Sequence, residues 1–102
     1  MDRPAKPLNG LLKMAVLAGV ETAVKLHIRR GDDLDARDGS GATPLMLAAG
    51  RGKQGVVTLL LDAGADPTLV DPEGRNALAY ARKSGSAECE AIVLSAMSRN
   101  EH

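Results

Sequence analysis

The fold of this chain is decided by the stretch Asp38–Ala49, which reads DGSGATPLMLAA. A related stretch, Asp71–Arg82 or DPEGRNALAYAR, follows in the next part of the chain, with Asp, Gly, Leu and Ala at the same offsets in both. A fixed period of the length that separates Asp38 from Asp71 is typical of repeat proteins, whose units bury their apolar faces only against one another. The sequence therefore predicts a stack of similar units.

The middle of the chain carries the signals of two short helices. Thr43 is suited to cap a helix, and Pro44 fits its first position, where the missing N–H needs no partner. We expect a first helix over 45–49 and a second helix over about 56–61, which ends at Ala63-Gly64. Together they form one helix-turn-helix unit.

The same plan is expected on both sides of this unit. Toward the N-terminus, Asn9 is a candidate N-cap for a helix that stops at Gly19, and a second helix is expected over 21–29. Toward the C-terminus, we expect helices over about 76–83 and 87–97. The chain therefore divides into three helix pairs.

The segments between the helix pairs, residues 32–41 and 65–74, are rich in Asp, Gly and Pro, which is typical of turns. Asp38 and Asp71 can accept hydrogen bonds from backbone N–H groups across each turn. A glycine three residues after each aspartate supplies the backbone freedom that a sharp bend needs. We expect two tight polar loops.

These residues resemble the ankyrin repeat. Its unit has a turn with Asp and Gly, a Thr-Pro-Leu helix start, an Ala-Ala pair, a Gly turn, a Val/Leu second helix and a Gly-Ala-Asp close. The middle unit matches at Asp38, Gly41, Thr43-Pro44-Leu45, Ala48-Ala49, Gly52, Val56-Val57, Leu59 to Leu61 and Gly64-Ala65-Asp66. The resemblance implies an all-α solenoid of three stacked helix-turn-helix units, joined by short β-turn or hairpin-like loops.

The resemblance covers residues 9–97, which we expect to form a single domain. Its units are predicted at about 9–36, 37–69 and 70–97. A flexible lead is expected at 1–8 and a polar tail at 98–102.

The outer units depart from the family pattern in ways that suggest caps. The third unit has Asn76-Ala77 in place of Thr-Pro, and its last helix carries Glu88 and Glu90. The first unit also lacks Thr-Pro, and its second helix carries polar His27 and the pair Arg29-Arg30. Because a terminal unit needs one polar face, we expect these residues to close a complete array of three units.

Composition and charge argue against several classes of function. The chain has 102 residues, 13 of them basic and 13 acidic, so no overall field favours nucleic acid or an anionic membrane. No apolar run reaches the length of a membrane span. The lone Cys89 cannot form an internal disulfide, which suits a reducing compartment. We expect a cytoplasmic monomer.

Two motifs suggest a ligand, and both are better explained as turns. The stretch 50–55, GRGKQG, matches the G-x-G-x-x-G pattern of dinucleotide loops, but that motif needs a preceding strand and here a helix precedes it. A calcium loop beginning at Asp33 needs a Gly where Asp38 stands and a Glu where Pro44 stands.

No pair of nucleophile and base is visible in the sequence. Cys89 shares a helical face with Ile92 and Val93, so we expect a small buried hydrophobe. His27 is expected to be a packed or partly exposed helix residue. We therefore predict no enzymatic activity and no catalytic, cofactor or metal site.

The resemblance implies that a partner binds at the loop tips and on the exposed side of the first helix of each pair. Carried onto this sequence, the predicted partner-binding residues are Arg37, Ser40, Ala42, Arg51, Lys53, Val70, Glu73, Arg75, Lys83 and Ser84. Tyr80, the only aromatic residue, either fills a gap between units or adds a further contact. The basic members predict a positive groove for an acidic or phosphorylated protein segment, and the alternative is a solvated basic face.

The sequence thus predicts a non-catalytic module that binds another protein and takes no small-molecule substrate. An alternative is a regulatory or recognition domain of a nucleic-acid-associated complex that uses the basic inner face. Zero net charge and the lack of stacking aromatics argue against nucleic acid.

Overall fold

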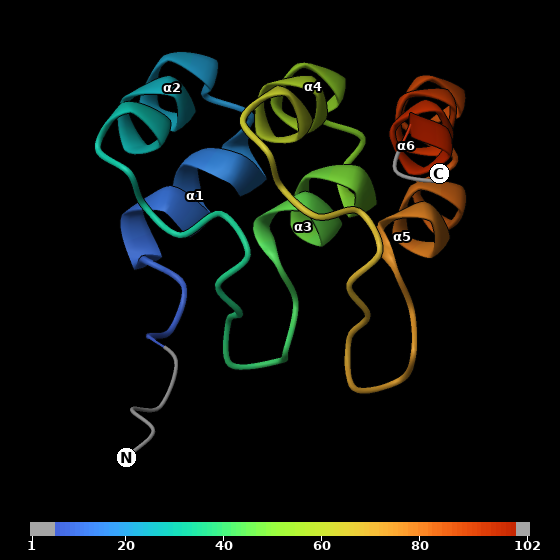
Figure 1. Ribbon diagram of the computed structural model, residues 1–102, viewed down its shortest axis with the longest axis horizontal. Coiled ribbons are helices and arrows are strands. Elements are labelled where there is room, and N and C mark those ends of the chain that lie inside the picture. Colours follow the sequence, from blue (N-terminus) through green and yellow to red (C-terminus); the bar gives the residue numbers. More distant parts are fainter. Residues whose placement is uncertain (1–5, 100–102) are drawn as a thin grey trace.

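The computed structural model describes residues 6–99, which form six helices and no strand. The helices are α1 (Gly10–Ala18), α2 (Glu21–Arg29), α3 (Pro44–Gly50), α4 (Gln54–Asp62), α5 (Ala77–Ser84) and α6 (Ala87–Arg99). Each consecutive pair forms one unit, numbered 1 to 3 along the chain. In Figure 1, α1, α3 and α5 form an inner layer, α2, α4 and α6 form an outer layer, and two loops project beyond the inner layer. The predicted all-α stack is confirmed.

A side chain caps the start of each inner helix. The side-chain oxygens of Asn9, Thr43 and Asn76 accept hydrogen bonds from backbone N–H groups in the first turn of α1, α3 and α5. Pro44 takes the first position of α3, as the sequence predicted. Asn76 was expected inside a helix, but it stands immediately before α5 and caps it as Thr43 caps α3.

The core is a continuous seam between the two layers, built from small aliphatic side chains. Leu12, Leu45 and Leu60 have at most 1% of their surface exposed. Cys89 is also fully buried, so its predicted role as a small hydrophobe is confirmed. Helices of seven to nine residues are marginal alone, so packing between units supplies most of their stability.

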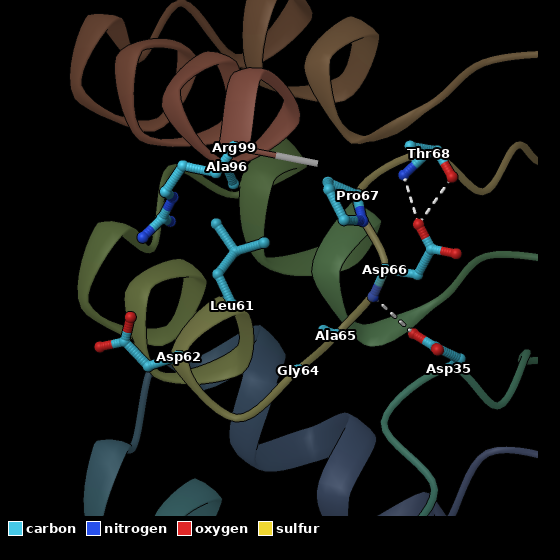
Figure 2. A pocket seen from close by; sticks show the side chains of 10 residues that line it. All are labelled: Asp35, Leu61, Asp62, Gly64, Ala65, Asp66, Pro67, Thr68, Ala96 and Arg99. Atoms are coloured by element: carbon cyan, nitrogen blue, oxygen red, sulfur yellow. Dashed lines mark hydrogen bonds between the residues drawn. The ribbon is translucent and has the colours of Figure 1, made fainter. Parts of the chain in front are cut away.

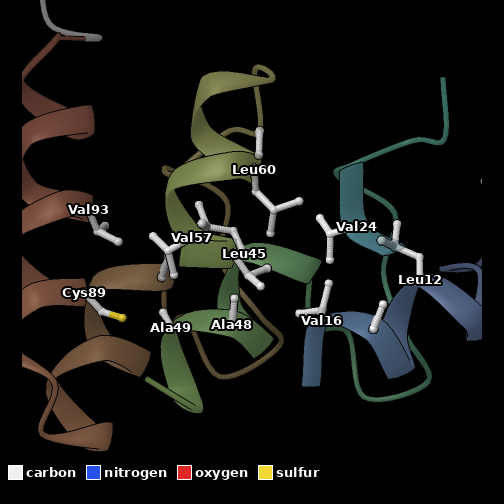
Figure 3. Packing of buried hydrophobic residues seen from close by; sticks show 14 of the residues in the cluster. Leu12, Val16, Val24, Leu45, Ala48, Ala49, Val57, Leu60, Cys89 and Val93 are labelled. Atoms are coloured by element: carbon white, nitrogen blue, oxygen red, sulfur yellow. The ribbon is translucent and has the colours of Figure 1, made fainter. Parts of the chain in front are cut away.

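The units interlock through small or β-branched side chains. In Figure 3, Val16 and Val24 point from unit 1 toward unit 2. Ala49 and Val57 occupy the same positions one repeat later and point from unit 2 toward unit 3. All four side chains are fully buried. Each of the first two units thus offers compact apolar side chains to the unit that follows it.

The fold begins earlier and ends later than the sequence indicated. Leu8, in the predicted flexible lead, is buried, and its N–H donates a hydrogen bond of 2.9 Å to the Arg37 carbonyl oxygen. Helix α6 continues to Arg99, past the predicted end at Met97. Residues 1–5 of the predicted lead and 100–102 of the predicted tail lie outside the described residues.

The last unit has the polar end that the sequence predicted. Nε of Arg82 donates to Oε1 of Glu90 at 3.1 Å, and both side chains are exposed to solvent. These two residues stand at the positions that Ala49 and Val57 occupy in unit 2. An ion pair therefore replaces the apolar side chains that another unit would cover.

At the other end of the described residues, unit 1 exposes large apolar side chains. His27 is buried, and its Nδ1 lies 2.6 Å from Oδ2 of Asp32, so it belongs to the interior of unit 1. The outward face instead carries Leu11, Met14 and Leu26, which are 68%, 68% and 56% exposed. The prediction that His27 helps to cap this end is therefore wrong, whereas Arg29 and Arg30 are exposed.

Candidate functional site

The two projecting loops are built alike, each around one aspartate. Oδ1 of Asp38 accepts hydrogen bonds from the N–H groups two and four residues later, at 2.9 and 3.0 Å. Oδ1 of Asp71 does the same, at 2.9 Å in both cases. The predicted role of these aspartates is confirmed, and it gives both loops the same fixed shape.

The loops also pack against each other. The Arg37 guanidinium donates to the carbonyl oxygen of Gly41 at 2.8 Å and, across to the next loop, to that of Val70 at 2.6 Å. Gly41 has a φ of +88°, and a Cβ at this position would lie 2.5 Å from Cδ of Pro72. Only glycine combines this left-handed backbone with so close an approach. The loop tips therefore form a continuous ridge.

Tyr80 connects α5 to the loop that precedes it. Its hydroxyl donates to Oδ2 of Asp71 at 2.6 Å, and Nε of Arg75 donates to the same oxygen at 2.9 Å. The Arg75 guanidinium also lies over the Tyr80 ring, 5.4 Å from its centroid, within the range of a cation–π interaction.

This network lowers the pKa of Asp71. Burial alone would raise the pKa of this carboxyl, but hydrogen bonds from Tyr80, Arg75 and the backbone outweigh burial and hold it at about 2. Burial and the bond to Asp71 raise the pKa of Tyr80. The carboxylate is thus ionised, and the phenol protonated, at neutral pH.

The ring of Tyr80 fills the space between two inner helices. A Cβ at Gly50 of α3 would lie 3.1 Å from Cδ2 of Tyr80, so the ring rests against the glycine backbone. The side chain is half-buried. This position favours a role for Tyr80 in packing between units. Its contact with a partner stays a prediction.

A groove of about 530 Å³ runs along the inner layer, across α1, α3 and α5. The residues that line it are Lys13, Leu17, Asp38, Met46, Leu47, Gly50, Arg51, Tyr80, Lys83 and Ser84. Its apolar part comes from leucine and methionine side chains. Its charged part has three basic side chains and one carboxylate, so the groove is positive.

Two of the basic side chains in the groove form no salt bridge with the residues that the structure describes. Nζ of Lys13 lies 3.0 Å from Oδ2 of Asp38 and balances its charge. Burial acts to raise the pKa of Asp38, but hydrogen bonds from Ser40, the backbone and Lys13 lower it well below its ordinary value. Arg51 and Lys83 form no salt bridge to any residue between 6 and 99. The positive charge of the groove therefore comes from these two side chains.

Most of the predicted partner-binding residues lie on this side of the molecule. Those that line the groove are Arg51, Tyr80, Lys83 and Ser84. Those exposed on the loops are Arg37, Ser40, Val70, Glu73 and Arg75. The structure thus brings together the groove and the ridge of loop tips as one continuous surface.

Two predicted residues lie elsewhere. Lys53 is half-buried, and its aliphatic stem lies over Gly19, where a Cβ would come within 2.9 Å of Cδ of Lys53. Ala42 is fully buried, so its predicted contact with a partner is wrong. Its N–H and carbonyl both bond to Asp38, and this pairing at the loop base leaves its side chain facing the interior.

Among the described residues, fewer basic side chains lack an acidic partner than the sequence suggested. Arg75 forms salt bridges of 2.9 Å to Asp71 and 3.3 Å to Glu73. Arg82 is paired with Glu90 at the end of the stack. Both guanidinium groups have an acidic partner. Arg51 and Lys83 therefore remain the main candidates for contact with an anionic group.

Several groove residues were not singled out from the sequence. Lys13, Leu17 and Leu47 line the groove beside the predicted residues. The sequence did carry a signal for some of the groove positions. Leu17, Gly50 and Lys83 stand at the same position of successive units, and all three line the groove. The repeat register thus points to equivalent groove positions in all three units.

A second and larger hollow, of about 820 Å³, lies between the end of α4, the following loop and the end of α6 (Figure 2). The polar groups of Asp35, Asp66 and Thr68 in its lining bond within the loops. Oδ1 of Asp66 accepts hydrogen bonds from N–H and Oγ1 of Thr68, at 2.9 and 2.6 Å, and these bonds lower its pKa. Oδ1 of Asp35 accepts the Asp66 N–H at 3.0 Å. The hollow is explained by loop structure, and the groove is the better candidate site.

The other candidate motifs have structural explanations. The glycine-rich stretch 50–55 joins α3 to α4 with helix on both sides, as expected of a turn. Within residues 6–99, no three His, Cys, Asp or Glu side chains gather as metal ligands would. No helix in that range has the length and apolar character needed to cross a bilayer.

Similarity to known proteins agrees with the fold. The family profile described as "Ankyrin repeats (3 copies)" matches residues 12–100. Neurogenic locus notch homolog protein 1 of Danio rerio is 37% identical over 84 residues, which are 81% of this chain and 3% of that protein. Dauer abnormal formation protein 25 of Caenorhabditis elegans is 45% identical over 74 residues, 72% of this chain and 18% of that protein. Protein HOS4 of Saccharomyces cerevisiae is 56% identical over 52 residues, 49% of this chain and 5% of that protein.

The chain therefore spans only a small part of these relatives. Its three helix pairs, its aspartate-centred loops and the family profile that matches nearly all of it agree. The chain belongs to the ankyrin repeat family, whose repeats generally mediate protein–protein interaction.

Proposed function

We propose that this chain is a non-catalytic module that binds an acidic segment of another protein in the groove along α1, α3 and α5. The observation that carries the proposal is the pair Arg51 and Lys83. Both are exposed, both line the groove, and neither is paired with a carboxylate among the described residues. Carboxylates or phosphates of a partner supply the charge-assisted hydrogen bonds that these cations lack.

The apolar part of the groove adds a second requirement. Leu17 and Leu47 line the same groove as the basic side chains and are half-buried. Charge complementarity favours rapid and correctly oriented association, whereas burial of apolar surface supplies much of the affinity. A segment that carries acidic residues beside at least one apolar side chain fits both parts.

The ridge of loop tips supports the same use of this face. Arg37 holds the two loops together, and Asp38 and Asp71 fix the shape of each. A surface that is already ordered loses little conformational entropy when a partner binds.

We further propose that the module acts as a monomeric adaptor in the cytoplasm. Cys89 is the only cysteine and is buried, which suits a compartment in which disulfides do not form. The ion pair of Arg82 and Glu90 closes one end of the stack against another copy.

The proposal is tested with a fluorescein-labelled oligoglutamate peptide, whose binding is followed by fluorescence anisotropy at low salt. The test variant is Arg51→Glu with Lys83→Glu. The matched control is Lys25→Glu with Arg29→Glu, the same charge change on the exposed side of α2. We expect the test variant to lose at least about tenfold in affinity, or about 1.4 kcal/mol, and the control to lose far less.

Two results contradict the proposal. One is equal affinity of the wild type and the test variant, with unchanged helix content by circular dichroism. The other is tighter binding of generic single-stranded DNA with a steep salt dependence, which would favour nucleic acid over a protein segment.

A further inference from the structure

Three of the most exposed large apolar side chains among the described residues lie on the two helices of unit 1. Leu11 and Met14 on α1 and Leu26 on α2 form the N-terminal face, with more than half of each side chain exposed. Single exposed leucines are common, but three large apolar side chains on one end of a stack point to a surface that is built for contact.

The repeat register shows how such a face is used elsewhere in the same molecule. The positions equivalent to Leu11, Met14 and Leu26 are Pro44, Leu47 and Leu59 in unit 2 and Ala77, Tyr80 and Ile92 in unit 3. Pro44 and Ala77 are fully buried, and the other four are half-buried and packed on the core. In units 2 and 3 these positions are thus wholly or partly covered by the interior of the stack.

The opposite side, or back, of units 1 and 2 carries compact apolar side chains. In Figure 3, Val16 and Val24 of unit 1 and Ala49 and Val57 of unit 2 point toward the following unit. The Tyr80 ring, at one of these equivalent positions, rests against Gly50 of the unit before it. The N-terminal face continues this pattern, but with its large side chains open to solvent.

A second copy of the chain is a poor occupant of this face. The back of its unit 3 carries Arg82 and Glu90 at the positions of Ala49 and Val57. Covering that ion pair with leucine and methionine would remove two charges from water without a new partner. Two N-terminal faces placed together would set large side chains against large ones, unlike either interface inside the molecule.

We infer that the N-terminal face is a docking surface for an ankyrin-type helix pair of a partner, which presents small or β-branched apolar residues at the positions of Ala49 and Val57. Among the described residues, one end of the stack exposes apolar side chains and the other carries the ion pair of Arg82 and Glu90. The inference rests on continuity with the two internal interfaces and is independent of the groove.

The test supplies such a helix pair directly. A copy of residues 37–69 is placed immediately before residue 4, which keeps the register of the repeat, because position 4 corresponds to position 37 as Leu12 does to Leu45. The matched control carries Ala49→Arg and Val57→Glu in the added copy only, the residues that unit 3 has at those positions. We expect the first extension to raise the midpoint of thermal unfolding by more than about 5 °C and the control to give little or no increase.

The face itself is tested by Leu11→Gln with Leu26→Gln. Because both side chains are exposed, the unextended variant keeps the wild-type midpoint, whereas the extended variant loses the gain. Equal gains for both extensions overturn the inference. So does a wild-type dimer in sedimentation that Leu11→Gln with Leu26→Gln dissociates, because a second copy is then the occupant.

Discussion

The hydroxyl oxygen of Tyr80 lies 2.6 Å from Oδ2 of Asp71, and this hydrogen bond joins helix α5 to the loop that precedes it. The only aromatic side chain in the sequence therefore has two structural tasks. Its ring fills the space beside Gly50 of α3, and its hydroxyl holds the carboxylate on which the second loop is built. Packing between units and the shape of the exposed loop are thus coupled.

Tyr80→Phe keeps the ring and removes the hydroxyl. Oδ2 of Asp71 then retains only the hydrogen bond from Arg75. We expect the midpoint of thermal unfolding to fall by roughly 4–8 °C, as for the loss of one favourable interaction in a domain of this size. If calorimetry finds no change, the bond between Tyr80 and Asp71 contributes nothing to stability.

The acid sensitivity of the fold depends on the same carboxylate. The pKa of Asp71 is about 2 in the folded chain, below its ordinary value of 3.8. A lowered folded-state pKa means that the carboxylate stabilises the fold above pH 3.8, and that this contribution is lost as the pH falls toward 2. Asp71→Asn should therefore be less stable than the wild type at neutral pH. The difference should narrow within this acidic range.

The comparison is made by thermal unfolding of both proteins across this pH range. Wild type and Asp71→Asn share every other acidic group, including Asp38, whose pKa is also lowered. A stability difference that stays constant from neutral to acidic pH would show that the charge of Asp71 does not stabilise the fold.

Two glycines in equivalent loop positions offer a matched test of loop packing. Gly41 and Gly74 both have a positive φ, of +88° and +79°. A Cβ at Gly41 meets Pro72, whereas a Cβ at Gly74 meets nothing within 4 Å. Alanine at either site should lower the stability of the protein by about 1–2 kcal/mol, because a side chain disfavours the left-handed backbone. Gly41→Ala should lose about 1–3 kcal/mol more from the clash. Equal losses in urea unfolding would show that the loop tips do not depend on this contact.

The core seam predicts a large loss for one leucine and a small loss for another. Leu60 has no exposed surface, and Leu60→Ala should lower the free energy of unfolding by about 2–5 kcal/mol. Leu94 on α6 is 42% exposed, so Leu94→Ala should cost far less, because few contacts are lost there. Chemical denaturation of the two variants measures the difference, and a small effect at Leu60 would contradict the arrangement of the core.

The parts of the fold that were predictable from sequence depend on local chemistry. Thr43 and Pro44 start a helix wherever the chain places them, and the fixed period between Asp38 and Asp71 shows that the unit is repeated. The aspartate-centred loops were predictable for the same reason, since Asp38 bonds to backbone within its own turn.

The parts that were not predictable depend on contacts between distant segments. Ala42 follows a run of polar and glycine residues in the sequence, but the pairing at the loop base turns its side chain inward. Lys13 lines the groove only because stacking brings α1 beside the loop that holds Asp38. His27 looked like a polar end residue, but its pairing with Asp32 allows it to be buried.

The bridge from Arg37 to Val70 has a consequence for selectivity. Because it joins neighbouring turns, the spacing of their tips is set before any contact is made. A flexible surface can adjust to ligands of many shapes. The ridge of loop tips has a fixed spacing, so it binds a ligand whose groups are spaced differently less well. Discrimination at this face is therefore expected to follow the spacing of a ligand's side chains more closely than their total charge.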